Sequence, residues 1–133
     1  MRIDVMGLNP VNAQGACFSR DMWRWHPLWA AVAALANNAG RVERPHTDDG
    51  DGLGATHSRE LAQELDEALA CGEADKFIRV IRGQCRAAGL PEVISLEDLR
   101  EFRDFLRDCG GGFSIRCPDH GRHALARRRL SLV

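Results

Sequence analysis

The segment SLEDLREFRDFLRDCGGGFSIR, residues 95–116, carries the clearest fold signal in this chain of 133 residues. Ser95 and Asp98 have the spacing of a capping box, with aspartate in place of glutamate, which predicts that a helix begins at about residue 96. Three glycines at 110–112 end this helix, and the alternation that follows is typical of a strand. The predicted apolar face of the helix contains Leu99, Phe102, Leu106 and Cys109, with Phe105 beside them.

Two further helices are predicted upstream of this segment. Leu61, Leu65 and Leu69 recur at intervals of four residues, which indicates one apolar helix face over residues 55–71. Gly72 separates this helix from the next one, over 73–88, and Gly89 ends the latter. The predicted apolar face of the second of these helices contains Phe77, Ile78, Ile81 and Cys85.

The N-terminal part predicts a strand, a loop and a helix. Residues 2–6 alternate between polar and apolar side chains, as in a strand with one buried face, and residues 7–15 are rich in glycine and asparagine, as in a loop. A helix then follows, with Pro27 in its first turn and Gly40 as a left-handed cap after its end. Its apolar stripe contains Trp25, Leu28, Trp29, Val32 and Leu35.

Together these elements predict an α+β fold that is mostly helical. About four helices pack on a small antiparallel sheet of two or three strands, formed by residues 2–6, 112–117 and, as the optional third strand, 128–133. The predicted organisation is a single globular domain over residues 1–117, followed by an Arg-rich C-terminal extension over 118–133.

Composition narrows the classes of function. The net charge of −1 gives no overall attraction to nucleic acid or membranes. The longest apolar run, residues 28–36, is far shorter than a membrane span, and no leader peptide is recognisable. Five cysteines without a Cys-x-x-Cys pair predict free thiols and a cytoplasmic location. The sequence contains no phosphate-binding glycine loop, nucleophile elbow or dinucleotide fingerprint, which argues against an enzyme of those classes.

The turn HTDDGDGL, residues 46–53, is the first candidate site. Its carboxylates can accept backbone N–H groups in a tight turn, or they can bind a divalent cation as the only cofactor that the sequence suggests. An alignment to a calcium-binding loop fails at the first and last ligands. The candidate metal ligands are therefore a mixed nitrogen and oxygen set, namely His46, Asp48, Asp49, Asp51 and His57. A weaker zinc set would combine Cys109 and Cys117 with His120 and His123.

An aromatic segment is the second candidate site. Trp23, Trp25 and Trp29, together with Arg20 and Arg24, could form a ligand platform, or the tryptophans could pack in the core as their helical spacing indicates. The run of arginines at 127–129 could contact nucleic acid, but it lacks accompanying aromatic residues and more often represents a solvated charge run.

Several short motifs occur in one order along residues 4–117. They are DVMG with Pro10 at residues 4–10, FSRDMWRWHPLW at 18–29, HTDDGDGL at 46–53, and Glu101-Phe102 with Phe105-Leu106 and GGF-x-I up to residue 115. In this combination the chain resembles a family of small uncharacterised bacterial and phage-encoded proteins. That family has no assigned activity, so the resemblance implies no function. Many relatives carry a cysteine-rich insertion resembling a zinc-binding segment between the third and fourth helices, which this chain lacks.

The sequence therefore supports three functional hypotheses. The first is a small interaction or regulatory module without catalytic activity, whose partner is another protein. The second is a divalent-metal-binding protein, with hydrolytic activity as one variant, that uses the acidic turn 46–57. The third is a weak nucleic-acid binder that acts through the Arg-rich tail, and no hypothesis involves a membrane.

Overall fold

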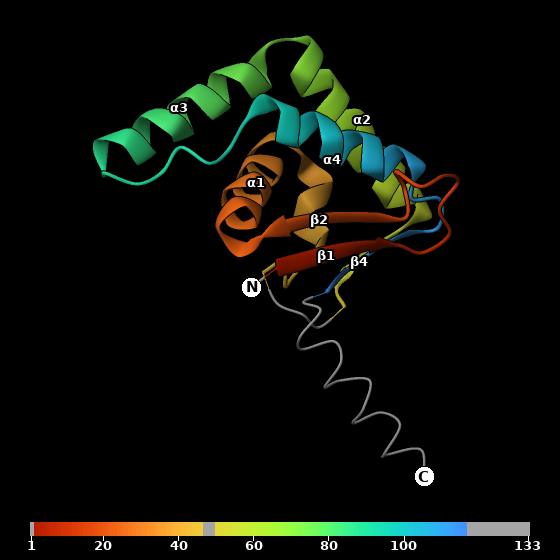
Figure 1. The fold of residues 1–133 in the computed structure, drawn as a ribbon. Helices are drawn as coiled ribbons and strands as arrows, with labels where there is room; N and C mark the ends of the chain where they lie inside the picture. Colours follow the sequence, from red (N-terminus) through yellow and green to blue (C-terminus); the bar gives the residue numbers. More distant parts are fainter. Residues whose placement is uncertain (1, 47–49, 117–133) are drawn as a thin grey trace.

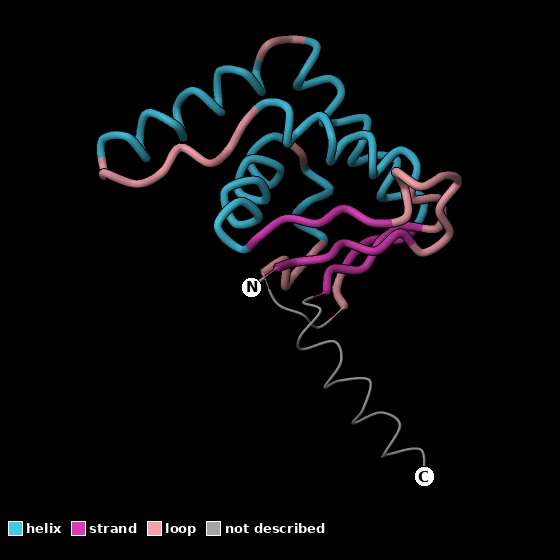
Figure 2. The backbone as a smooth tube through the Cα atoms, viewed as in Figure 1, coloured by secondary structure: helices cyan, strands magenta, loops and turns pink. Residues whose placement is uncertain are grey.

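The structure is a computed structural model that describes residues 2–46 and 50–116. Four α-helices lie over one face of an antiparallel sheet, so the predicted α+β class is confirmed (Figure 1). Figure 2 shows the two layers, with the strands together below the helices. The elements in chain order are β1 (Arg2–Gly7), β2 (Cys17–Asp21), α1 (Met22–Leu35), the 3₁₀ helix η1 (Asn37–Arg41), β3 (Gly52–Gly54), α2 (Ala55–Ala70), α3 (Glu73–Ala87), α4 (Leu96–Asp108) and β4 (Gly112–Arg116).

The sheet has four strands in the order β2-β1-β4-β3, and each neighbouring pair is antiparallel. Val5 of β1 lies opposite Phe18 on one side and Ile115 on the other, while Leu53 of β3 lies opposite Phe113. Because side chains alternate along a strand, these apolar residues share the face that the helices cover. All five are buried.

The prediction of two or three strands was wrong, because β2 and β3 were not among the predicted strands. β2 has five residues, and two of them, Phe18 and Arg20, lie on the face toward the helices. Because Arg20 is charged, β2 lacks the alternation of polar and apolar residues that would have predicted a strand. β3 is the tripeptide Gly-Leu-Gly, whose extended backbone is held by pairing with β4 and not by its own side chains. The predicted strand at 128–133 lies outside the described residues.

The first helix differs from the prediction at both ends. The carboxylate of Asp21 accepts the N–H of Arg24 at 2.9 Å and caps a helix that begins at Met22, so Pro27 lies inside α1 and not in its first turn. The helix ends at Leu35, and the extended Ala36 leads into η1. Gly40 lies in η1 and does not have the positive φ expected of a left-handed cap.

The predictions for the other helices are confirmed. α4 begins with the capping box of Ser95 and Asp98, and the face predicted from Leu99 to Cys109 is buried. Gly72 and Gly89 have positive φ at the two ends of α3. Figure 1 shows α3 extending away from the sheet. Within the described residues, no helix is both long and apolar enough to cross a membrane.

Candidate functional site

The three candidate tryptophans have different environments. Trp25 and Trp29 are buried, and both rings pack against Phe102 at centroid distances of 5.8 and 6.2 Å. Trp23 is 82% exposed. The helical stripe therefore places Trp25 and Trp29 in the core, whereas Trp23, two residues before Trp25, lies on the outer face of the helix and is exposed to solvent.

Arg20 connects the sheet to α4. Its Nε donates to Asp98 Oδ1 at 3.1 Å, and its Nη2 donates to Glu101. Its guanidinium also lies over the ring of Phe18, 4.3 Å from the centroid. The Arg20 side chain is only 17% exposed, so this candidate residue has a clear structural role at the end of β2.

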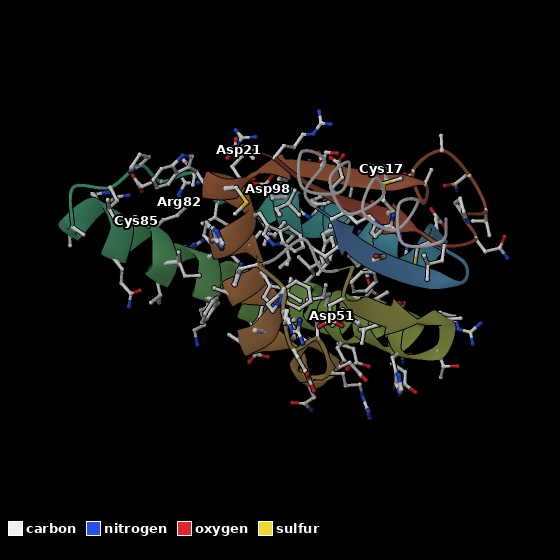
Figure 3. All side chains as sticks on the ribbon, turned by 90° about the horizontal axis from the view of Figure 1, so that it is seen from below. Cys17, Asp21, Asp51, Arg82, Cys85 and Asp98 are labelled. Atoms are coloured by element: carbon white, nitrogen blue, oxygen red, sulfur yellow. The ribbon has the colours of Figure 1, made fainter. Side chains whose placement is uncertain are left out.

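A shallow pocket of about 380 Å³ lies beside Arg20 and is lined by Arg2, Ser19, Arg20, Asp21 and Arg24. Three arginines and one aspartate are therefore among its lining residues, but two of the arginines are paired with carboxylates outside the lining. Arg20 is paired with Asp98 and Glu101, and Arg2 is paired with Asp4 at 3.0 Å. The carboxylate of Asp21 accepts the N–H of Arg24 as the cap of α1. Figure 3 labels Asp21 and Asp98, which lie at the same end of the sheet. This pocket is thus a depression next to the first turn of α1, and Arg24 is its lining arginine that makes no ion pair within the described residues.

Pro27 adds a polar feature to that first turn. In a helix the N–H of residue 27 would bond to the carbonyl of Trp23, but proline has no N–H. The carbonyl of Trp23 therefore cannot receive this helical hydrogen bond.

The acidic turn is held together by Asp51. Its Oδ2 accepts the backbone N–H groups of Glu43 and Arg44, both at 2.9 Å, and its Oδ1 accepts that of Gly52 at 2.9 Å. Burial opposes the charged form of Asp51, but these N–H donors outweigh it and lower the pKa of the carboxyl below its usual 3.8. The carboxylate of Asp51 therefore accepts backbone N–H groups, which agrees with the interpretation of this segment as a tight turn. Asp48 and Asp49 lie outside the described residues.

Replacing Asp51 by asparagine is expected to lower the free energy of unfolding by about 1–2 kcal/mol at pH 7, because charge-assisted hydrogen bonds to the backbone are lost. The lowered pKa means that this stabilisation is fully present above the unfolded-state pKa of 3.8 and is lost as the pH falls through the folded-state pKa. Urea denaturation at pH 7 and at decreasing acidic pH should therefore show the difference between Asp51→Asn and the parent protein narrowing below about pH 4.

The two candidate histidines do not meet each other. His46 faces His26 instead, with 2.5 Å between their Nδ1 atoms and 4.2 Å between the ring centroids. Burial lowers the pKa of His46, and the neighbouring His26 lowers it further. His57 lies half-buried on α2. His26 was missed because it stands 20 residues from His46, and no spacing rule relates the two positions.

The described residues do not bring together either of the two predicted sets of metal ligands. Among these residues, no group of three or more histidine, cysteine, aspartate or glutamate side chains is placed to hold a metal ion. Cys109 is buried, and its thiol is directed at the carbonyl of Leu106 at 3.2 Å, as expected for a core cysteine. The other members of that zinc set, and the arginines at 127–129, lie outside the described residues.

Comparisons with known proteins give no indication of function. No family model, no curated protein and no solved structure matches the chain. The resemblance to small bacterial and phage-encoded proteins therefore stays a prediction.

Proposed function

We propose that this protein is a non-catalytic interaction module that binds an acidic segment of a partner protein through the first turn of α1. The observation that carries the proposal is Trp23, which is 82% exposed and is adjacent in the chain to Arg24, one of the residues that line the pocket. We call this surface, formed by Trp23, Arg24, Arg2 and the pocket, the Trp23 surface.

The composition of the Trp23 surface suits protein recognition. Tryptophan and arginine are the residues most enriched among those that dominate binding energy at protein interfaces. An indole in water has a large apolar area to bury, and its N–H gives the contact direction. The rest of α1 shows why this exposure is informative, since the other two tryptophans of the same segment are almost fully buried.

Charge defines the partner. Arg20 and Arg2 are paired with carboxylates of this chain, whereas Arg24 makes no ion pair within the described residues, and the carboxylate of Asp21 is engaged as the cap of α1. Arginine binds carboxylates through paired hydrogen bonds, so a segment rich in aspartate or glutamate complements the pocket. An apolar residue in the same segment would pack on the indole.

Replacing Trp23 by alanine is expected to weaken binding of such a segment by about 30-fold, which corresponds to about 2 kcal/mol. The measurement is fluorescence anisotropy of a fluorescein-labelled peptide that alternates glutamate with leucine. Arg24→Glu should weaken binding as well, and added salt should weaken binding of the parent protein because charge attracts the peptide.

Two exposed residues outside the Trp23 surface provide matched controls. Leu90 is a large apolar residue at 59% exposure, and Arg79 on α3 has a side chain that is 78% exposed. Leu90→Ala and Arg79→Glu should bind the peptide as the parent does. The Trp23 variant should keep the urea midpoint of the parent, because exposed substitutions change stability by less than about 0.5 kcal/mol. Equal peptide affinity for Trp23→Ala and the parent would contradict the proposal.

A further inference from the structure

A pair of histidines joins α1 to the first residue of the acidic turn, outside the Trp23 surface. The Nδ1 atoms of His26 and His46 lie 2.5 Å apart, and the ring planes are inclined by 44°. The rings therefore meet through their nitrogen atoms and not only through their faces. Both residues lie at the surface of the molecule.

The chain next to each histidine is anchored. Trp25, the residue before His26, has no exposed surface, and its Nε1 donates to the carbonyl of Pro45 at 2.7 Å. Pro45 is the residue before His46, so one hydrogen bond between buried tryptophan and loop brings the two imidazoles together. On the other side of the loop, Asp51 holds the N–H groups of Glu43 and Arg44. The pair is thus positioned by the core and by the turn.

Two neutral imidazoles can share one proton between their Nδ1 atoms, or they can both offer Nδ1 lone pairs to a metal ion. In the second case each ring carries its proton on Nε2, so no proton is gained or lost overall. Zinc binds histidine nitrogen at about 2.0–2.1 Å in a tetrahedral arrangement, which sets two such nitrogens roughly 3.3 Å apart. The two rings need to separate by less than about 1 Å to reach this geometry.

We propose that His26 and His46 form a binding site for a divalent transition-metal ion of the zinc type, with Trp25 as a positioning residue. This site goes beyond the proposed function and does not use the Trp23 surface. Among the described residues no third ligand joins the pair, so within them the pair supplies two ligands, and water can occupy the remaining coordination positions. Such a site binds zinc more weakly than a structural site with four protein ligands. It prefers Zn²⁺, Cu²⁺ or Ni²⁺ to Ca²⁺ and Mg²⁺, which select oxygen ligands.

Isothermal titration of the full chain with ZnCl₂ tests the proposal. His26→Ala and His46→Ala are each expected to lose one zinc site or to weaken it by at least about tenfold, and CaCl₂ should give no binding at that site. His57→Ala is the matched control, because His57 belongs to neither anchor and should leave zinc binding unchanged. Since both members of the pair are exposed, circular dichroism should show that all three variants keep the parent fold.

Trp25→Phe tests the positioning role. Phenylalanine keeps an aromatic ring in the core but cannot donate to the carbonyl of Pro45, so zinc affinity should fall while both ligands remain. The Nδ1 resonances of His26 and His46 should also shift together on adding zinc to the parent protein. Zinc binding of unchanged stoichiometry and affinity in both alanine variants would overturn the proposal, as would the absence of zinc binding by the parent. Peptide binding at the Trp23 surface, measured without metal, is independent of either result.

Discussion

Replacing Gly110 by alanine is expected to destabilise the protein by about 2–5 kcal/mol. Gly110 has φ +68°, a left-handed conformation that costs an alanine about 1–2 kcal/mol. A Cβ atom built there would lie 1.7 Å from the carbonyl oxygen of Asn9. Relieving such an overlap by shifting the backbone typically costs a further 1–3 kcal/mol.

The shift would disturb the contact between two chain segments. The N–H of Asn9 bonds to the carbonyl of Cys109, and the N–H of Leu8 bonds to that of Gly112. These bonds attach the loop after β1 to the turn between α4 and β4, so moving Asn9 strains the pairing of the two central strands. Urea denaturation of the purified variant, followed by circular dichroism, measures the loss.

Gly89→Ala is the matched control for this prediction. Gly89 has φ +70°, nearly the value of Gly110, but no heavy atom lies within 4 Å of the Cβ that alanine would add. Gly89→Ala should therefore lower the free energy of unfolding only by the cost of the left-handed conformation, about 1–2 kcal/mol. Equal losses in the two variants would show that the close approach of Asn9 is unimportant.

Local signals explain what the sequence could predict about the fold. The capping box of Ser95 and Asp98 is formed by residues three positions apart, and the buried face of α4 follows from helical periodicity alone. Gly72 and Gly89 end helices through their own left-handed conformation. Each of these features depends on neighbours in the chain, so a sequence pattern reports them.

The two missed strands depend on distant residues. β3 contains a single side chain larger than hydrogen, and its hydrogen bonds with β4 join residues 52–54 to 112–114. At Gly52 a Cβ would lie 1.8 Å from the carbonyl of Phe113, so the glycine that obscured the strand pattern is required by the pairing. In β2 the inward charge of Arg20 is compensated by Asp98 and Glu101, far away in sequence.

The candidate sites also combine features that depend on neighbours in the chain with features that depend on distant residues. Periodicity suggested that the tryptophans could be core residues, but it could not tell that Trp23 faces water while Trp25 and Trp29 do not, because the start of α1 depends on the cap at Asp21. The contact between His26 and His46 depends on the bond between Trp25 and Pro45, which no motif encodes.

Replacing Phe102 by alanine is expected to lower the free energy of unfolding by about 3–5 kcal/mol, which is the second large effect. Phe102 has no exposed surface, and its ring lies at the centre of the aromatic core. Rings from three other elements surround it at centroid distances of 5.1–6.4 Å, together with Phe105 of the same helix. The neighbours are Phe18 of β2, Trp25 and Trp29 of α1, and Phe113 of β4. Removing this ring leaves a cavity that α4, α1 and the sheet all border, so no single element can move to fill it.

A loss of this size is a large fraction of the 5–15 kcal/mol by which domains are usually stable. Phe102→Leu should cost distinctly less, since it keeps most of the volume and loses mainly the ring contacts. Val80→Ala, at a position that is 55% exposed, should change stability by less than about 0.5 kcal/mol. The cavity also borders Trp25, whose indole holds Pro45 beside the histidine pair. Phe102→Ala should therefore weaken zinc binding as well as folding, whereas a variant that unfolds in less urea but binds zinc like the parent would separate the aromatic core from the site.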